Sequence, residues 1–531
     1  MKYSIGVQSF EKIIEDGYIY VDKTDLVYRL VKDGKVYFLN RPRRFGKSLL
    51  ISTLENYFLG RKELFKGLKI DALEKDWFEY PVFKLSFGSS DYMKPTALDD
   101  AIGHFVRNAE KRFGVTPDID SYGIRFADVL KTAHEKTGRK AVVLIDEYDK
   151  PLLDVMDCDE AVMDINGNKK RIEDYNRNVL KAFYGVFKDA DEHLQFVFLT
   201  GVTKFSQISV FSGFNQPKDI SMDRRYEALC GITTEELLSI FDEPIRELAE
   251  EEGVEYTEMV DRLKRKYDGY HFGDNMTDIY NPFSLLNCFD SMKLYNYWFA
   301  SGTPTYLVRL LQHCDENINE LAGRYYDVSQ FVNYKADVQR PLPMIYQSGY
   351  LTIKAYRRDM NIYLLDFPNE EVRSGFIDVL SADYFKGRED PRSWLNEVTD
   401  YLRLGNVEGF MTRMTSLLSS ATYRFQRKQD EKECERYFQY SFYLILQMLA
   451  HYSVIAEKET SQGRIDCVVE YPEYVYIMEF KLNGCASAAL QQIKDKGYAK
   501  PYQSGTRKII CIGINFSSET GTVESYEKNY E

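Results

Sequence analysis

Residues 36–58 read VYFLNRPRRFGKSLLISTLENYF, and this stretch decides the fold of the first part of the chain. Its first five residues, Val36–Asn40, form a short apolar run of the kind found in buried strands. The residues from Lys47 to Phe58 have the spacing of a helix, and Arg41–Gly46 separates the two elements. A strand that passes through a tight loop into a helix is the first unit of an α/β sheet.

The loop itself carries Gly46-Lys47-Ser48, the end of the P-loop pattern GxxxxGK[ST]. That pattern begins with Gly, whereas this chain has Arg41 there. In a P-loop the main-chain N–H groups and the helix N-terminus surround phosphate. The lysine reaches the β- and γ-phosphates and the hydroxyl coordinates Mg²⁺. Gly-Lys-Ser alone arises often by chance, so the prediction depends on the rest of the sequence.

A second apolar run, Ala141–Ile145, ends in Asp146-Glu147 and matches the Walker B arrangement. Asp146 is expected to hold Mg²⁺ through water, and Glu147 to orient or deprotonate the attacking water. Alone, this segment would be an acidic turn after a buried strand. Together with Lys47 and Ser48 it predicts binding and hydrolysis of ATP.

Two more apolar runs, Pro81–Phe87 and Gln195–Thr200, extend the predicted sheet, with helices such as Tyr175–Lys188 between strands. Thr200 or Thr203 could contact the γ-phosphate or the water, although threonines at strand ends are as often structural. Arg224 or Arg225 is a weaker candidate for an arginine finger. The residues expected to bind ATP are Arg43, Arg44, Phe45, Gly46, Lys47, Ser48, Leu49, Asp146 and Thr200, with Ser48 and Asp146 as magnesium ligands.

The length of 531 residues predicts about three domains. We expect an ATPase sheet with helices on both faces in residues 1–232, a helical lid or winged-helix-like region in 233–368, and a further α/β domain in 369–531. In the middle region, Thr233 is predicted to cap a helix, 257–267 and most of 297–337 to be helical, and 347–353 to return to a strand.

The composition excludes several classes of protein. No apolar run approaches the roughly 18 residues of a membrane span, and the N-terminus lacks the apolar core of a signal peptide. The eight cysteines contain no CxxC pair, which argues against zinc and disulfides and for a reducing cytoplasm. A net charge of −13 weakens nonspecific nucleic-acid binding, and the basic runs at 41–47, 262–266 and 424–432 favour solvated faces.

The last region carries a second group of residues with a chemical pattern. Gly463-Arg464-Ile465-Asp466 begins one predicted strand, and the next strand ends with Glu479-Phe480-Lys481. This is the PD-(D/E)xK nuclease pattern, in which Asp466 and Glu479 share Mg²⁺ or Mn²⁺ and Lys481 positions the nucleophile. Alternation along the strand points Glu479 and Lys481 to one face. The predicted element order is helices, three strands, a helix with the accessory candidates Gln492 and Tyr498, and a final strand 508–514.

Taken together, these motifs resemble those of bacterial AAA-ATPase-like proteins that carry a C-terminal domain of the PD-(D/E)xK nuclease superfamily. Arg41–Ser48 is specific to such proteins, so Arg41 fits that family. The other strings that carry the resemblance are Val21–Thr24, Leu144–Asp149, Thr200–Phe205, Tyr267–Tyr270, Tyr280–Ser284, Gly463–Asp466, Glu479–Lys481, and Gln492-Ile493 with Tyr498. Glu459 also matches a family position, but Thr460–Gly463 replaces a more glycine-rich turn.

The resemblance implies an ATP- and Mg²⁺-dependent nuclease, with ATP binding controlling a site that acts on DNA or RNA, and it is compatible with a homo-oligomer. The predicted catalytic residues are Glu147, Asp466, Glu479, Lys481 and Gln492. The alternative is a signalling or scaffold ATPase whose nuclease-like domain binds nucleic acid or protein without cutting. A purely non-enzymatic interaction protein is a third reading, which Lys47 and Asp146-Glu147 disfavour.

Overall fold

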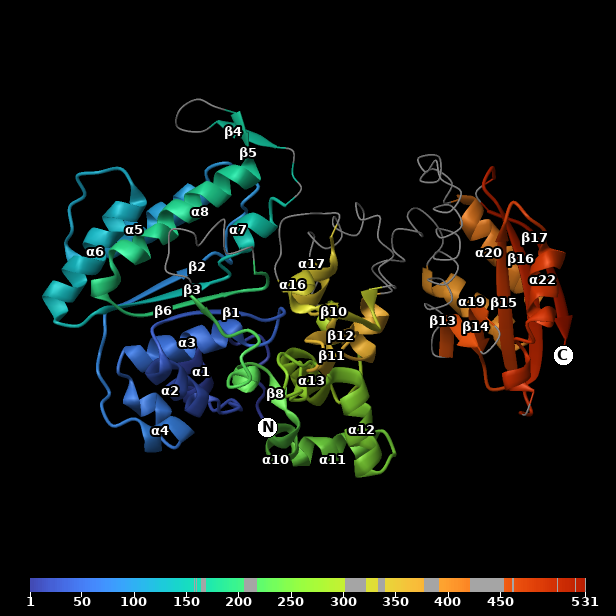
Figure 1. Ribbon diagram of the computed structural model, residues 1–531. Helices are drawn as coiled ribbons and strands as arrows, with labels where there is room; N and C mark the ends of the chain where they lie inside the picture. The colour runs from blue at the N-terminus through green and yellow to red at the C-terminus, as the bar shows by residue number, and fades with distance from the viewer. Residues whose placement is uncertain are drawn as a thin grey trace. The chain divides into compact units, whose positions relative to one another are not determined.

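A computed structural model describes residues 1–156, 158, 160–163, 169–204, 217–300, 321–332, 340–376, 391–420, 453–460, 463–503, 505–520 and 522–530 (Figure 1). The chain divides into two compact units, Met1–Arg373 and Ser374–Glu531. The predicted basic run 424–432 lies outside the described residues. None of the helices in the described ranges has the length and apolar character needed to cross a bilayer.

The centre of the first unit is a five-stranded, fully parallel sheet in the order β2-β3-β6-β1-β7. The four apolar runs of the sequence form its first four strands, so the prediction of an α/β sheet is confirmed. The fifth strand, β7, is two residues long and was not predicted. The strands are β1 (Val36–Asn40), β2 (Val82–Ser86), β3 (Ala141–Asp146), β6 (Leu194–Gly201) and β7 (Lys218–Asp219).

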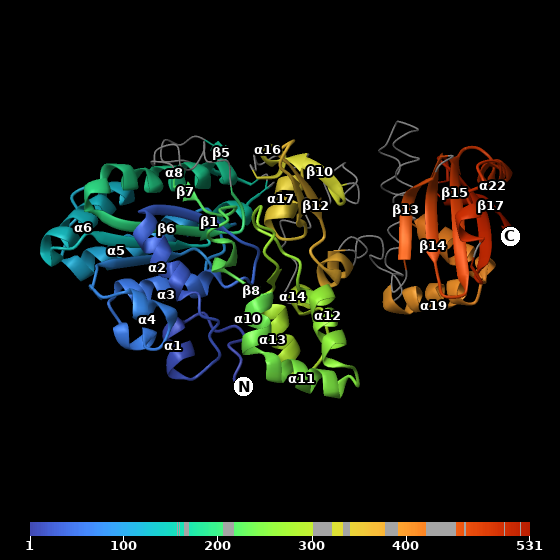
Figure 2. The same ribbon diagram turned by 60° about the horizontal axis from the view of Figure 1, so that its bottom comes forward.

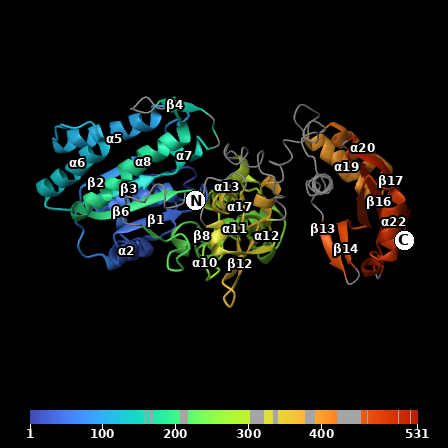
Figure 3. The same ribbon diagram turned by 45° about the horizontal axis from the view of Figure 1, so that its top comes forward.

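Helices cover both faces of this sheet. One face carries α5 (Ala97–Phe113), α6 (Tyr122–Thr137) and α8 (Ile172–Asp189), which lie side by side (Figure 3). The other face carries α1 (Phe10–Glu15), α2 (Thr24–Asp33), α3 (Lys47–Phe58) and α4 (Lys69–Leu73) (Figure 1). Shorter elements are η1 (Lys62–Phe65), α7 (Lys150–Leu153), η2 (Asp191–His193), η3 (Glu227–Leu229) and the hairpin of β4 (Ala161–Met163) and β5 (Lys169–Arg171).

The middle of the chain packs in the same unit and begins with helices. Thr233 caps the first helix as predicted, in a capping box with Glu236. The elements of this part are β8 (Ile232–Thr233), α10 (Thr234–Ile240), α11 (Asp242–Glu251), α12 (Tyr256–Tyr267), β9 (Ile279–Tyr280), α13 (Pro282–Ser291), α14 (Tyr297–Ala300), α16 (Val328–Phe331) and α17 (Leu342–Gln347).

A small antiparallel sheet in the order β10-β12-β11 completes the middle part (Figure 1), and Figure 2 shows β10 and β12 next to α17. Its strands are β10 (Arg324–Asp327), β11 (Thr352–Arg357) and β12 (Ile362–Asp366). Two predictions are wrong here. Residues 324–327 were expected to be helical and form a strand, and Gln347 ends a helix rather than starting a strand. Residues 301–320 and 333–337 of the predicted helical stretch lie outside the described residues.

The second unit is a mixed five-stranded sheet in the order β13-β14-β15-β16-β17. Only β15 and β16 are parallel, and α22 makes the crossover between them. Helices α19 and α20 pack on one face and α22 on the other. The last strand, β17, was missed from the sequence. The elements are α19 (Pro391–Arg403), α20 (Val407–Ser420), β13 (Ser453–Thr460), β14 (Gly463–Glu470), β15 (Tyr474–Leu482), α22 (Ala486–Asp495), η6 (Lys500–Tyr502), β16 (Lys508–Ser517) and β17 (Thr522–Tyr530).

Candidate functional site

The loop between β1 and α3 has the geometry of an anion-binding turn. Gly46 is the N-cap of α3 and adopts a left-handed conformation with φ 88°, and Arg44 is also left-handed with φ 67°. No side chain caps the N-terminus of α3, and a Cβ at Gly46 would meet no atom within 4 Å. The N-terminus of α3 is thus uncapped beside an open space at Gly46, and uncapped N–H groups at a helix start are groups that can bind an anion.

Lys47 lies inside this loop. It is 7% exposed, and its Nζ donates to the carbonyls of Arg41 at 2.9 Å and Pro42 at 2.8 Å. Burial lowers the pKa of Lys47, while the charges of Asp146 and then Asp149 oppose that shift. The ammonium group is thus already held in the loop by main-chain carbonyls. Ser48 and Leu49 follow in the first turn of α3 and are partly exposed.

The two acids at the end of β3 lie beside the end of β6. Asp146 is buried, and its Oδ1 accepts hydrogen bonds from Thr200 Oγ1 at 2.7 Å and from the N–H of Glu147 at 3.0 Å. Parallel pairing of β3 with β6 brings these residues together at the carboxyl edge of the sheet. Thr200, rather than Thr203, is the threonine that contacts Asp146.

Glu147 occupies a tight position after Asp146. Its φ is 53°, a left-handed conformation that costs energy for a residue other than glycine. Burial, and then the charge of Asp146, raises the pKa of Glu147, while Lys47 and Arg43 oppose the shift. A Cβ at Gly88 would lie 2.9 Å from Glu147 Oε2, so Gly88 leaves the space that this carboxylate occupies.

The two arginine-finger candidates are placed elsewhere. Arg225 bonds to Asp223 and lies 3.5 Å from Asp33, which precedes β1 at the end of the strand opposite the P-loop. Arg224 is exposed on the same turn. The structure therefore brings neither residue to Lys47. The basic run 262–266 includes Arg262 and Arg265, which pair with Glu258 on the surface of α12.

Residues of the middle part support the loop from behind. Phe45 is fully buried and packs edge-on against Tyr270 and Phe272, with ring centroids 4.7 and 5.5 Å apart. Trp298 Nε1 donates to the carbonyl of Arg43 at 3.1 Å. Arg43 and Arg44 are exposed, and the Arg44 guanidinium lies 4.9 Å from the centre of the Phe283 ring.

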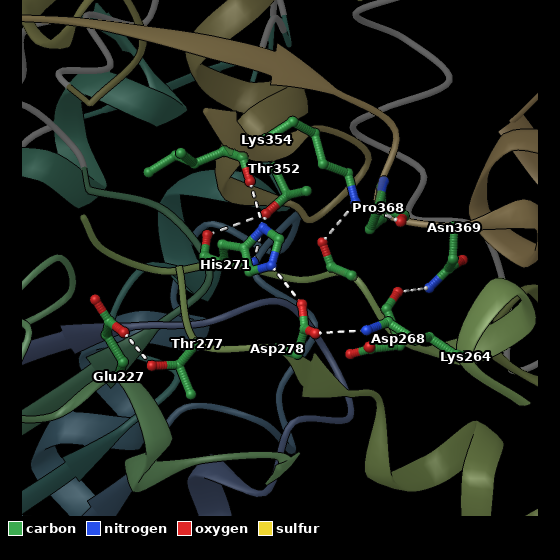
Figure 4. A network of polar contacts seen from close by, with 12 residues as sticks. Glu227, Lys264, Asp268, His271, Thr277, Asp278, Thr352, Lys354, Pro368 and Asn369 are labelled. Carbon is green, nitrogen blue, oxygen red and sulfur yellow. Dashed lines mark hydrogen bonds and ion pairs between the residues drawn. The ribbon is translucent and has the colours of Figure 1, made fainter. Parts of the chain in front are cut away.

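Between the two aromatic residues that contact Phe45, His271 belongs to a polar network (Figure 4). One ring nitrogen lies 2.7 Å from the carbonyl of Ile353 and the other 2.8 Å from Asp278 Oδ1. Lys264 Nζ donates to the other oxygen of Asp278 at 2.8 Å, and Thr352 exchanges hydrogen bonds with the main chain of His271. The segment behind the P-loop is therefore tied to β11 and α12.

In the second unit, β14, β15 and α22 bring together the residues of the second pattern. Asp466 Oδ2 accepts from the N–H of Phe480 at 2.8 Å, and Glu479 lies on the adjacent strand. Gln492 donates through Nε2 to Glu479 Oε1 and accepts through Oε1 from Lys481 Nζ at 2.7 Å. Sequence reasoning proposed Gln492 as an accessory group, and only its packing on the sheet reveals that it bridges the other two.

The chemistry of Glu479 fits a cation. It is 2% exposed, and burial, then the charge of Asp466, raises its pKa to about 8. Its Oε2 is buried without a hydrogen-bond partner, so one oxygen of a buried carboxylate is left for a ligand. Asp466 supplies a second carboxylate. Among the described residues no group of three or more His, Cys, Asp or Glu side chains is found, and the side chain of Glu459 on β13 is not among those described.

Tyr498, the other accessory candidate, is buried in the apolar core under α22. Burial and the neighbouring charge of Glu479 raise the pKa of its phenol. The sequence motifs assign no role to Gly88, Asp149 or Trp298, and they mark Arg41 only as a departure from the common P-loop pattern. Asp149 and Arg41 stood inside strings that carried the resemblance, which is the signal that could have found them.

Comparison with known proteins matches two parts of the chain to protein families. Residues 4–211 match the AAA-ATPase-like family, described as predicted AAA-ATPase, and residues 433–526 match the PD-(D/E)XK nuclease superfamily. The chain is 34% identical over 531 residues, 99% of its length and 98% of the relative's, to a protein of Azotobacter chroococcum mcd 1 described as "Uncharacterized protein in vnfD 5'region". The chain belongs to the family of AAA-ATPase-like proteins with a C-terminal domain of the PD-(D/E)XK nuclease superfamily.

Proposed function

We propose that the protein hydrolyses ATP in its first unit and that this controls a metal-dependent nuclease site in its second unit, which acts on DNA or RNA. The observation that carries the nuclease half is the buried Glu479, with one unpartnered oxygen, next to Asp466 and to the Lys481–Gln492 pair. The families usually use ATP and Mg²⁺, and the residues present suit both.

For ATP hydrolysis, each residue of the first site has a role that follows from its position. Lys47 and the N–H groups at the start of α3 would bind the phosphates, and Ser48 and Asp146 would hold Mg²⁺. Bound MgATP supplies an electrophilic γ-phosphate. Glu147 would orient or deprotonate the attacking water, and its raised pKa makes it a stronger base than an ordinary glutamate. Thr200 would keep Asp146 oriented through their 2.7 Å hydrogen bond.

For phosphodiester hydrolysis, Asp466 and Glu479 would hold Mg²⁺ or Mn²⁺, which supplies Lewis acidity and lowers the pKa of water. Lys481 would position the nucleophile or the scissile phosphate. Gln492 would fix both Glu479 and Lys481, because its amide bonds to each of them. A side-chain amide suits this bridge, since it offers a donor to the carboxylate and an acceptor to the ammonium group.

Control by ATP is supported by contacts that lead away from the P-loop. Trp298 donates through its ring to the carbonyl of Arg43 and through its main-chain N–H to Glu371 Oε1 at 2.8 Å. Glu371 is 1% exposed and lies two residues before the end of the first unit at Arg373. A change in the P-loop on binding ATP would therefore reach the end of that unit.

The ATPase half is tested with purified full-length protein and phosphate release. Lys47→Ala and Glu147→Gln are expected to lower kcat at least about 100-fold, since a positioned general base and a charge held on the transferring phosphate each contribute about that much. Two exposed residues of α6 serve as controls, and Lys131→Ala and Glu135→Gln should behave as the wild type. Equal rates in all five proteins would show that the hydrolysis comes from elsewhere.

The nuclease half is tested on single- and double-stranded DNA and RNA, with Mg²⁺ or Mn²⁺, with and without ATP. Asp466→Ala and Lys481→Ala should lower cleavage by roughly 100-fold or more, while Lys508→Ala at the exposed start of β16 should not. In Lys47→Ala the effect of ATP on cleavage should disappear. If no substrate is cut, or if the site variants cut as well as wild type, the nuclease proposal fails. The alternative, a scaffold ATPase whose second unit binds nucleic acid or protein without cutting, is then favoured.

A further inference from the structure

Asp149 is a buried carboxylate that accepts three hydrogen bonds from the two residues after β6. It is 1% exposed, and its Oδ2 accepts from the N–H of Val202 at 2.9 Å, the N–H of Thr203 at 2.6 Å and Thr203 Oγ1 at 2.8 Å. A buried acid is costly unless such donors surround it. Here the donors come from a single segment more than fifty residues away in the chain.

Tyr148 adds two contacts between the same two segments. Its N–H donates to the carbonyl of Thr200 at 3.0 Å, and its hydroxyl donates to the carbonyl of Thr203 at 2.8 Å. Gly201 lies between them, where a Cβ would come within 2.5 Å of Asp149 Oδ1 and 2.7 Å of the Tyr148 ring. The end of β6 is therefore pressed against residues 148 and 149 with no room for a side chain.

These contacts join the two segments that carry the hydrolytic residues. Asp146 and Glu147 immediately precede Tyr148 and Asp149, and Thr200 immediately precedes Gly201. Thr200 bonds to Asp146 across the gap. A shift of the 202–203 segment would therefore move the Thr200 hydroxyl away from Asp146. Asp149 itself is buried and accepts its hydrogen bonds from the 202–203 segment.

The segment is also held from its other side. The N–H of Lys204 donates to Gln347 Oε1 at 2.7 Å. Gln347 is 3% exposed in α17, and its Nε2 donates to the carbonyls of Phe331 at 3.3 Å and Val332 at 2.6 Å. Residues 202–204 thus lie between Asp149 and the middle part of the chain, with buried polar contacts to each.

We propose that Asp149 is a positioning residue for ATP hydrolysis, which holds residues 202–203 so that Thr200, Asp146 and Glu147 stay aligned. The proposal rests on the ATPase activity proposed above. Asp149 acts through its neighbours, since all three hydrogen bonds that its Oδ2 accepts come from Val202 and Thr203. A charged acceptor suits this role, because hydrogen bonds to an ionised carboxylate are stronger than those to a neutral group.

The test is Asp149→Asn in the full-length protein, together with Thr203→Val and Thr203→Ser. The asparagine keeps the size but loses the charge; Thr203→Val removes one donor, and Thr203→Ser keeps it. We expect kcat for ATP to fall about 10- to 100-fold in Asp149→Asn, as for a small misplacement of catalytic groups. The kcat of Thr203→Val should fall less than that of Asp149→Asn, and the kcat of Thr203→Ser should stay near the wild-type value. The Kd of a fluorescent ATP analogue should change less than about twofold in Thr203→Val and Thr203→Ser, because both variants keep the charge of Asp149 near Lys47.

A matched control is Asp154→Asn, which lies just beyond α7 and pairs with Lys150. It should leave kcat, Kd and the thermal midpoint unchanged. If Asp149→Asn and Thr203→Val both keep the wild-type kcat, the positioning role is overturned, but the proposal that the protein is an ATPase still stands. The positioning role is also overturned if Thr203→Val loses kcat and ATP affinity to the same extent while Thr203→Ser loses neither. That result would indicate that the whole nucleotide site is disrupted, rather than the alignment of the hydrolytic residues. Absence of hydrolysis by the wild type overturns both this proposal and the ATPase itself.

Discussion

Arg41 stands where the common P-loop pattern has glycine, and its side chain explains why this is tolerated. It is 1% exposed, and its guanidinium donates to the carbonyls of Asn40, Ser221 and Tyr226. It also lies 4.0 Å from the centre of the Phe272 ring. The side chain therefore bonds to carbonyls of Asn40, Ser221 and Tyr226, outside residues 42–48 of the loop.

Replacing this arginine tests its structural role. Arg41→Met leaves three carbonyls without their donors, and the free energy of unfolding of the first unit is expected to fall by about 2 kcal/mol or more. Urea unfolding followed by circular dichroism measures this. Arg246→Met, at an exposed ion pair on α11, should leave the urea midpoint unchanged. Equal midpoints for Arg41→Met and wild type would contradict a structural role.

The buried carboxyl of Asp268 is expected to make the free energy of unfolding depend on pH. It is fully buried, and burial raises its pKa to about 7; the charge of Asp278 adds to this shift, while Lys264 and Lys354 oppose it (Figure 4). Since the folded pKa lies above the unfolded value, the native state holds this proton more tightly. The resulting stability is complete below about pH 4 and is lost as the pH rises through 7.

The expected result is a free energy of unfolding that declines between pH 5 and pH 8 in the wild type and declines less in Asp268→Asn. The difference between the two slopes isolates this carboxyl from other acids with raised pKa values, such as Glu371. Denaturant titrations at each pH provide the measurement, and the exposed Asp128→Asn is the control. Parallel slopes in all three proteins would rule out Asp268 as the cause.

At the scale of elements, the local sequence pattern succeeded where strands are buried. Ala141–Asp146 is buried throughout, so its apolar run is uninterrupted and predicts a central strand. The apolar pattern did not predict several strands at the edges of the sheets. β17 lies at the edge of its sheet, most of its residues are exposed or half-buried, and it has no alternating apolar signal. β10 and β7 are also edge strands and are only four and two residues long.

The close approach of α22 to β16 is an element-scale feature of the nuclease-like site. Gly513 lies next to Glu479 in the register of β15 and β16. A Cβ there would lie 2.2 Å from the carbonyl of Ala486 and 2.5 Å from the N–H of Leu490. Only glycine lets the helix backbone come this near, and this contact sets the distance from Gln492 to Glu479.

Gly513→Ala is therefore expected to move α22 outward and to lower cleavage by about 10-fold or more, because Gln492 no longer bridges Glu479 and Lys481. The ATPase rate should be unaffected. Gly505→Ala, whose added Cβ would meet nothing closer than 3.8 Å, is the matched control. Both activities are measured on the same preparations. Normal cleavage by Gly513→Ala would mean that the position of α22 is not critical.

At the scale of the whole molecule, the two units have separate cores. In the second, residues of α19 and α20 such as Phe410 and Met414 pack with Tyr476 and Ile512 of the sheet. Domains with their own cores unfold as separate cooperative transitions. The predicted boundaries at 232 and 368 stay predictions, since the compact division falls at Arg373.

Calorimetry of the full-length protein is expected to give two unfolding transitions. MgATP at about 100 times its Kd should stabilise one of them by roughly 2.7 kcal/mol and leave the other in place. Lys47→Ala should abolish the shift, and Lys131→Ala should preserve it. A single transition that moves as a whole with ATP would indicate that the units unfold together.

The sequence by itself determined the strand, loop and helix of residues 36–58, the acids after β3, and the shared face of Glu479 and Lys481. These features depend on contiguous residues and on the fixed periods of helices and strands. The tertiary structure alone decided that the Arg41 side chain turns toward Ser221, that Asp149 holds the segment after β6, and that Gln492 bridges Glu479 and Lys481. Such contacts join residues far apart in the chain, so they depend on how close two packed elements come, and no local pattern records that distance.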